Sequence, residues 1–419
     1  MTKHPRLASL AAILALALAA CGGGAAAPSA VPASSAAAPK PAASAASVSA
    51  KPAASASASA KPAASGSAAA AGSAAPKPTA TFVPRVAADT STGTLTNYPI
   101  PGTEGKVSDV DIIDVDQEGH VLYMADRLTG IDEFDISGPT AKFLRSVKTP
   151  SPPNGVIVAK NVNRVVAGLT DSSVVSIDMG THQIVGTVNT GGKKRADELD
   201  YDPKDKKVYV ANSDDGIITA IDMATFKVSK KFDNMGQEIE QPRYDPADGM
   251  MYVVIRSPEQ LAQFDPAKDE LVKKFDLPKG SRPSGIWMNP KTNVGIISTD
   301  PRPIVWDFSA GKMVGSLDQA AKGDEIFYDA KTDLYFSPGS SAPWGPTMSI
   351  LGGTPIKFIT NVATTSRSHN AGFDNTNNVV YTTGPDGLVG FPLPANALGG
   401  ASASGGAAPK PSAAAKPSA

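Results

Sequence analysis

Short apolar runs separated by turn-forming residues fill the chain from about residue 107 to residue 394. The clearest unit has four such runs, within Leu199–Asp202, Lys207–Asn212, Gly216–Asp222 and Val228–Phe232. Each run is rich in β-branched or aromatic residues, and segments such as Asp-Pro, Asn-Ser-Asp-Asp-Gly and Met-Ala-Thr lie between them. Runs of this kind, without helical periodicity, predict β-strands joined by tight turns. The unit therefore predicts four strands.

The same unit recurs along the chain. An apolar residue followed by aspartate ends the third run at Asp135, Asp178, Asp222, Asp265 and Asp307, at intervals of 43, 44, 43 and 42 residues. A second landmark, in the second run, gives the same register in seven copies: Tyr123, Val166, Tyr209, Tyr252, Gly295, Tyr335 and Tyr381. Four strands in about 43 residues is typical of a propeller blade. The sequence predicts an all-β fold, a seven-bladed β-propeller of four-stranded antiparallel blades.

The last repeat ends too early to be complete. Its third run stops near Leu393, and the Ala/Ser/Pro/Gly composition that follows offers no fourth strand. The segment Thr94–Ile100, which precedes the first repeat, has the composition of a strand. If it pairs with the last repeat, the ring closes and an exposed sheet edge disappears. Pro99 suits an outermost strand, because proline donates no backbone hydrogen bond. We therefore expect an N-terminal strand to close the last blade.

Residues 199–232 resemble the YVTN family of β-propeller repeats, named for the strand seen here as Tyr209-Val-Ala-Asn212. The resemblance extends from about Val107 to Pro394 and weakens in the sixth repeat, where Gly339–Trp344 replaces the usual turn. It implies the propeller fold and selects no particular activity.

The beginning of the chain has the layout of an export signal. Lys3 and Arg6 precede an apolar run, Leu7–Ala20, which is too short to span a membrane and is followed by Cys21. Leu18-Ala-Ala-Cys21 resembles the bacterial lipobox, which implies that residues 1–20 are a signal peptide and that Cys21 carries the lipid (palmitate and related acyl chains). The alternative is an ordinary signal peptide with an incidental cysteine. With Gly22 in place of the aspartate that retains lipoproteins at the inner membrane, we expect an outer-membrane or cell-surface location.

Cys21 is the single cysteine of the chain. Intramolecular disulfides, cysteine-based zinc sites and CxxCH haem attachment are therefore excluded. The missing haem motif also weighs against an electron-transfer propeller.

Two segments flanking the propeller are almost devoid of large side chains. Residues 21–85, a predicted tether, and 397–419, a predicted tail, consist mainly of Ala, Ser, Pro, Gly and a few lysines. Such segments bury too little to offset the entropy of ordering, and we expect disorder in both. The folded region 86–396 then contains all 40 acidic residues and 30 of the 39 basic ones, a net charge near −10. Without a basic stripe, nucleic acid is not an expected partner. We expect a monomer.

The repeat register also predicts which residues surround one mouth of the central channel. Each innermost strand should begin there, at a polar residue five positions before the aspartate that ends the first run, such as Asp202, or its equivalent. These mouth residues are Asp111, Asn154, Asp197, Glu240, Ser284, Asp324 and His369. Glu198, Gln241, Glu325 and Asn370 follow four of them, and because strand neighbours point to opposite sides, only one carboxylate of each adjacent acidic pair is expected to point inward. Arg195, Arg243 and Arg282 lie near enough to pair with them, and Trp344 is a candidate platform for a sugar or peptide.

Two functions fit such a mouth. The first is a binding or scaffold module for an unknown protein or small molecule, in which the polar mouth residues are simply solvated or contact the ligand. The second is a lactonase-like hydrolase or lyase in which Asp197, Glu240 and Asp324 hold Ca²⁺ or Mg²⁺, with His369 and Glu240 as candidate catalytic residues. No nucleophile elbow, phosphate loop or HExxH motif is present, and we expect a non-enzymatic binding module.

Overall fold

The computed structural model describes residues 90–91, 93–106, 109–340, 342 and 344–401, which all belong to one compact unit spanning residues 80–419. The predicted signal peptide, Cys21 and the tether lie outside the described residues. Within them, no helix is long and apolar enough to cross a membrane. Their one α-helix, α1 (Ala395–Ala401), includes the predicted boundary between propeller and tail at residue 396.

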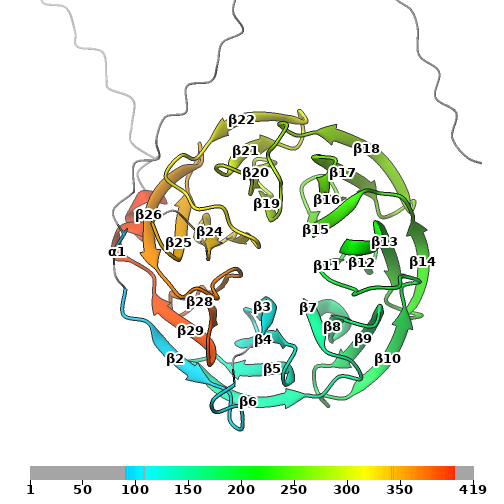
Figure 1. The fold of residues 1–419 in the computed structure, drawn as a ribbon, viewed down its shortest axis with the longest axis horizontal. Helices are drawn as coiled ribbons and strands as arrows, with labels where there is room; N and C mark the ends of the chain where they lie inside the picture. The colour runs from blue at the N-terminus through cyan, green and yellow to red at the C-terminus, as the bar shows by residue number, and fades with distance from the viewer. Residues whose placement is uncertain (1–89, 92, 107–108, 341, 343, 402–419) are drawn as a thin grey trace, which may run out of the picture. The chain divides into compact units, whose positions relative to one another are not determined.

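Seven antiparallel blades stand around a common axis (Figure 1). In each blade the strands follow one another from the axis outward. Blades one to three contain β3 (Val110–Asp116), β4 (Val121–Asp126), β5 (Gly130–Asp135) and β6 (Lys142–Val147); β7 (Pro153–Ala159), β8 (Arg164–Leu169), β9 (Ser173–Asp178) and β10 (Ile184–Asn189); and β11 (Leu199–Asp202), β12 (Lys207–Asn212), β13 (Ile217–Asp222) and β14 (Lys227–Phe232).

Blades four to six continue the order. They contain β15 (Gln237–Asp245), β16 (Met250–Ser257), β17 (Gln260–Asp265) and β18 (Glu270–Asp276); β19 (Ile286–Asn289), β20 (Val294–Ile297), β21 (Ile304–Asp307) and β22 (Lys312–Ser316); and β23 (Phe327–Asp329), β24 (Leu334–Gly339), β25 (Thr347–Gly352) and β26 (Lys357–Ala363). The seventh blade is β27 (Gly372–Asp374), β28 (Val379–Gly384), β29 (Gly387–Pro392) and, from the other end of the chain, β2 (Thr96–Pro99). The predicted seven-bladed all-β fold is confirmed.

The predicted closing strand is confirmed as well. Strand β2 pairs antiparallel with β29, with Asn97 opposite Val389, and the Tyr98 and Tyr381 rings lie 6.2 Å apart. A second N-terminal pairing was not predicted: β1 (Thr90–Ser91) runs parallel to β26 and adds a fifth strand to blade six. The N-terminal part of the folded region thus contacts both of the last two blades.

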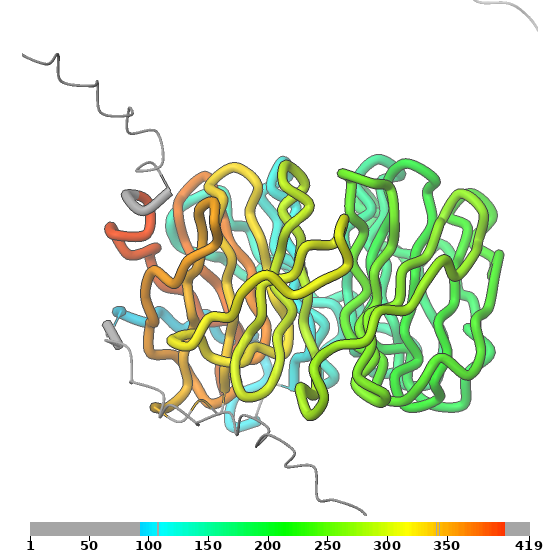
Figure 2. Tube along the Cα trace, turned by 90° about the horizontal axis from the view of Figure 1, so that it is seen from above, coloured from blue at the N-terminus to red at the C-terminus, as the bar shows by residue number. Residues whose placement is uncertain are grey.

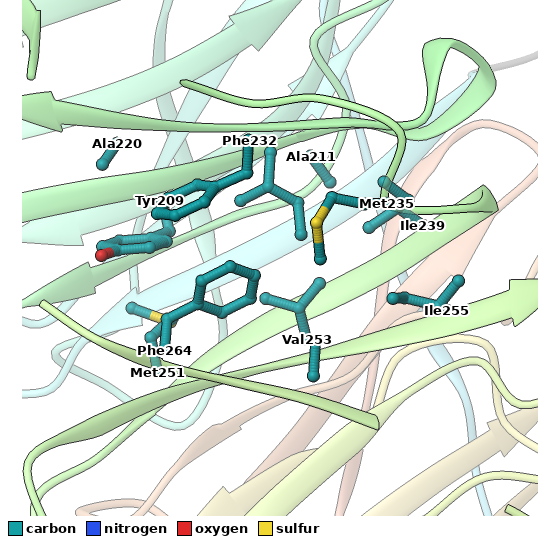
Figure 3. Close-up of a cluster of buried hydrophobic side chains, with 12 residues drawn as sticks. Tyr209, Ala211, Ala220, Phe232, Met235, Ile239, Met251, Val253, Ile255 and Phe264 are labelled. Atoms are coloured by element: carbon teal, nitrogen blue, oxygen red, sulfur yellow. The ribbon is translucent and has the colours of Figure 1, made fainter. Parts of the chain in front are cut away.

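The core consists of layers of side chains between neighbouring blades. Figure 3 shows one layer, in which Tyr209 and Phe232 of blade three meet Phe264 of blade four. The Phe232 and Phe264 ring centres are 4.8 Å apart at a steep angle, the edge-to-face geometry that aromatic pairs favour. Stacking of this kind holds the ring together, because a single blade has no core of its own.

The recurring aspartates have a structural reason. Asp222, at the end of β13, accepts hydrogen bonds from the Thr225 backbone N–H and hydroxyl, at 2.8 and 2.7 Å, and so fixes the turn to β14. Asp202, at the end of β11, caps the turn to β12 through the Lys204 N–H in the same way. Both are Asx turns, in which the side chain replaces a backbone acceptor. The edge-on view in Figure 2 shows such loops gathered at the two faces of the unit.

Candidate functional site at the channel mouth

The mouth is the end of the axis at which the seven innermost strands begin. Asp111, Asn154 and Glu240 lie in the first residues of β3, β7 and β15, whereas Asp197, Ser284, Asp324 and His369 lie in the loops just before β11, β19, β23 and β27. Side-chain contacts across blades, described below, place most of these residues around one opening. Ser284 is fully buried and donates to the Gly323 carbonyl at 2.8 Å, so its hydroxyl holds a loop.

Arginines that the sequence reasoning did not include connect the mouth residues. Arg127, in the β4–β5 loop, contacts Asp111 through its guanidinium and donates from Nε to Asn154 Oδ1 at 2.8 Å. It therefore ties blade one to blade two. Its place after the second strand is a loop position that the repeat pattern leaves variable, which is why the register could not identify it.

Arg256, at the end of β16, has the same role on the opposite side of the mouth. Its guanidinium lies 3.0 Å from Glu238, 3.0 Å from Glu240 and 3.7 Å from Asp324. Glu240 belongs to blade four and Asp324 precedes blade six, so one side chain spans two carboxylates that are far apart in the sequence.

The three arginines expected near the mouth differ in position. Arg195 pairs with Asp197 at 2.9 Å. Arg243 lies deeper, 3.7 Å from Glu325 and 3.8 Å from Asp200, with its guanidinium carbon 4.4 Å from the Trp287 ring centre. Arg282 is exposed. Trp344, in the loop of blade six, is partly buried.

His369 contacts Asp111, with Nε2 3.5 Å from Oδ1. Its backbone carbonyl accepts a hydrogen bond from the Glu325 N–H at 3.0 Å. The imidazole therefore lies beside the Asp111 carboxylate of blade one, the neighbouring blade. The Asp324 carboxylate is contacted by Arg256 instead.

Beneath this ring, three buried glutamates form a cluster from three blades. Glu198, Glu240 and Glu325 are 5%, 8% and 6% exposed, and the carboxyl group of Glu198 interacts with both others. Burial raises the pKa of Glu325 to about 8, and it raises the pKa values of Glu198 and Glu240 well above the usual range. Such carboxyls hold protons near neutral pH, and a proton shared between two of them serves as a hydrogen-bond donor.

The expectation that only one of each adjacent acidic pair points inward is wrong for Asp197 and Glu198. Both are buried in the mouth, at 3% and 5% exposure. The reason is that β11 begins only at Leu199, so the two residues lie in a loop where strand alternation does not apply. Asp324 and Glu325 also lie in a loop, before β23 begins at Phe327, and they differ in burial: the Asp324 side chain is 48% exposed and that of Glu325 is 8% exposed.

Below the cluster, the channel narrows to a cavity of about 20 Å³ lined by Asp114, Asp200, Gln241, Arg243, Trp287 and Glu325, among others. Gln241 of blade four donates to the Ile326 carbonyl, next to blade six, at 3.0 Å. A space of this size holds about one water molecule. An organic ligand is therefore too large for the space below the glutamates.

The predicted cation ligands are already engaged by arginine. Arg195 contacts Asp197, and Arg256 contacts Glu240 and Asp324. Among the described residues, no group of three or more His, Cys, Asp or Glu side chains is placed to hold a metal ion. Calcium or magnesium at this mouth stays a prediction.

Comparisons with known proteins identify the fold. No family model matches the chain, and no curated protein matches it. Among solved structures, a chain from the crystal structure of the mitotic checkpoint complex is similar with a TM-score of 0.59 and 12% identity, over 73% of this chain and 94% of that one. At this identity the likeness shows the fold alone. Because 1739 chains of solved structures match, the fold does not select a function.

Proposed function

We propose that this protein is a binding or scaffold module that a lipid on Cys21 holds in the bacterial cell envelope. The observation that carries the proposal is the mouth, where Arg127 and Arg256 each hold polar groups of two blades in fixed positions. Charged groups that are ordered before a ligand arrives lose little entropy on binding. They also give orientation and specificity to the complex.

The partner expected at this mouth is polar and carries both charge signs. Its basic groups would meet the exposed carboxylates, such as Asp324, and its acidic groups the outward sides of Arg195 and Arg127. The cavity of about 20 Å³ below the glutamates limits the depth of entry. A peptide segment or protein surface lying across the mouth fits these limits better than a buried metabolite.

The lipid anchor is tested by fractionation of cells that produce the full chain. The proposal expects the wild-type protein in the detergent phase of a Triton X-114 partition and labelling by an alkyne fatty acid. Cys21→Ser should abolish the label and move the protein to the aqueous phase. A wild-type chain without label would overturn the anchor and leave the mouth proposal intact.

Recognition at the mouth is tested by photo-crosslinking in intact cells. A benzophenone side chain at Arg367, an exposed residue of the β26–β27 loop, should capture a partner. The matched probe at Val185, which is 54% exposed on the outer strand β10, should not. Capture that Arg256→Ala abolishes supports the mouth, whereas equal capture from both probes contradicts it.

The hydrolase alternative needs a bound cation, and two measurements separate it from the binding module. Adding Ca²⁺ or Mg²⁺ to the protein should raise its Tm if a cation binds the folded state. Turnover of a lactone panel that requires the same cation would establish the alternative. No Tm shift and no turnover would leave the binding module.

A further inference from the structure

An apolar groove lies between blades five and six, away from the mouth. It has a volume of about 440 Å³ and is lined by residues of the outer half of blade five and of the β25–β26 turn, among them Val294, Val305, Val314, Gly315, Pro355 and Ile356. Val314 is 51% exposed. A groove of this size, with three valines, a proline and an isoleucine in its lining, attracts an apolar side chain.

The equivalent groove between blades two and three is filled by a phenylalanine ring. Strand pairing makes Gly186 of β10 the counterpart of Gly315 of β22, since Gly186 pairs with Ser176 and Gly315 with Val305 at the same position of the ladder. A Cβ added to Gly186 would lie 2.7 Å from the ring of Phe226. The first atom met by a Cβ at Gly315 belongs to Val305 of the same blade, at 3.6 Å.

The residue that corresponds to Phe226 in blade six is Ile356. Each immediately precedes the fourth strand of its blade counted from the axis, β14 at Lys227 and β26 at Lys357. An isoleucine is smaller than a phenylalanine and lacks its flat ring. The groove between blades five and six therefore lacks the volume of an aromatic side chain that its counterpart contains.

The chain has one aromatic residue that can reach this groove from outside the described part. Phe82 is the only aromatic residue between positions 22 and 89 and is followed by Val83. Strand β1 pairs with β26 in parallel, Thr90 with Asn361 and Ser91 with Val362, and a continuation of this direction before Thr90 would lead to Lys357 and the β25–β26 turn. Continued one for one, this register places Phe82 level with Gly353, which lines the groove.

The length of the connection fits. An extended chain covers about 3.3 Å per residue, so the segment from Phe82 to Thr90 reaches about 26 Å. The β26 segment from Asn361 back to Lys357 accounts for about half of that length. Pro84 cannot donate to a strand ladder, and the chain is therefore free to leave the edge of β26 before it reaches the groove.

We propose that Phe82 of this same chain, with Val83, binds in the groove between blades five and six. The ring takes the place that Phe226 occupies between blades two and three. Docking there fixes the point at which the tether leaves the propeller. The tether would thus leave the propeller at the outer edge of blade six. Followed away from the propeller, it would run in the direction opposite to that of strand β1.

Cysteine crosslinking in the full chain carrying Cys21→Ser tests the position of Phe82. The pair Phe82→Cys and Val314→Cys should form an intramolecular disulfide under mild oxidation, detected by peptide mass spectrometry. The matched control is Phe82→Cys with Val185→Cys, because Val185 precedes Gly186 as Val314 precedes Gly315 and is equally exposed, 54% against 51%. At least a fivefold excess of the Val314 crosslink is expected. Equal yields overturn the proposal, and so do crosslinks between two chains, which would indicate a second copy in the groove.

Thermal unfolding of the same full chain tests the packing. Phe82→Ala should lower Tm by about 2–4 °C, the shift typical of one lost apolar contact in a domain of this size. Ile356→Phe fills the groove from within, so adding Phe82→Ala to it should change Tm by less than about 1 °C. An unchanged Tm for Phe82→Ala alone, or an equal loss in both backgrounds, would overturn the proposal.

Discussion

The guanidinium carbon of Arg243 lies 4.4 Å from the ring centre of Trp287, and this stack closes the central channel below the mouth. Arg243 is 8% exposed. Its guanidinium is also the cation nearest to Glu325 and Asp200, at 3.7 and 3.8 Å. An arginine is suited to this place because its flat group stacks on an aromatic face while its edges remain directed at carboxylates.

Arg243→Ala should therefore destabilise the propeller. Removal of one partner of a buried charged group leaves the others uncompensated, which costs on the order of 3 kcal/mol, or a Tm loss of about 6 °C or more. Arg243→Lys keeps the charge but loses the stack, and its decrease in Tm should be smaller than that of Arg243→Ala. The control is Arg302→Ala, whose pair with Asp318 is exposed on both sides; its Tm should change by less than about 1 °C. Equal shifts for Arg243→Ala and Arg302→Ala would contradict the role of the stack.

The buried glutamates predict that stability falls as pH rises. The pKa of Glu325 is raised from 4.5 to about 8, so the folded state holds a proton that the unfolded state releases above pH 4.5. The corresponding stability is fully present below about pH 4.5 and is lost as the pH rises towards 8. Because one pKa unit corresponds to about 1.4 kcal/mol, a loss of stability on the order of 3 kcal/mol between pH 5 and 8 is expected from urea unfolding.

Glu325→Gln tests this assignment. An amide can donate a hydrogen bond to Glu198 at every pH, and so the variant should show a flatter dependence of its urea midpoint on pH than the wild type does. Asp324→Asn, next to it in the chain but half-exposed, serves as the control. A wild-type midpoint that rises from pH 5 to pH 8 would exclude the proton-holding cluster.

Sequence spacing was sufficient for the fold because the residues that set it are local. Asp222 caps its own turn three residues later, and a tyrosine stands at the place of Tyr209 in five of the seven second strands, so both leave a periodic trace. The two-residue strand β1 was missed because Thr90-Ser91 has no apolar pattern. Its pairing with β26 depends on which sheet edge is free, and that depends on the closed ring.

The candidate site was predictable in part for a similar reason. The polar residue at the start of each inner strand follows from the repeat, and Asp111 and Glu240 were found in this way. Arg127 lies in a loop and Arg256 at the end of β16, at positions where the repeats share no residue type, and each has a partner that belongs to another blade. The burial of Glu198 beside Glu325 depends on how three blades pack together. The residue spacing within one repeat does not predict this packing.

The turn aspartates allow a prediction about the repeat itself. Asp222→Ala removes the acceptor for the Thr225 N–H and hydroxyl, and capping losses of this kind cost about 1 kcal/mol. A Tm decrease of about 2–4 °C is expected. Asp233→Ala, whose side chain is 55% exposed and pairs with Lys231, is the control and should leave Tm within about 1 °C. A larger Tm decrease for Asp233→Ala than for Asp222→Ala would mean that the aspartate recurs at this position for a reason other than capping the turn.

Closure of the ring by β2 leads to the last prediction. A chain that begins at Gly93 lacks β1 but keeps β2, and should still unfold in one cooperative transition, because blade six retains its four antiparallel strands. A chain that begins at Pro101 lacks β2, which uncovers the edge of β29 and the apolar surface of Leu388 and Tyr381. Exposed edges of this kind pair with other chains, so the second protein should aggregate in size-exclusion chromatography or melt at least about 10 °C lower. A synthetic peptide of residues 94–100 should restore part of that loss, since it supplies the missing strand in trans. If the chain from Pro101 is monomeric with an unchanged Tm, the ring does not depend on β2 for its closure.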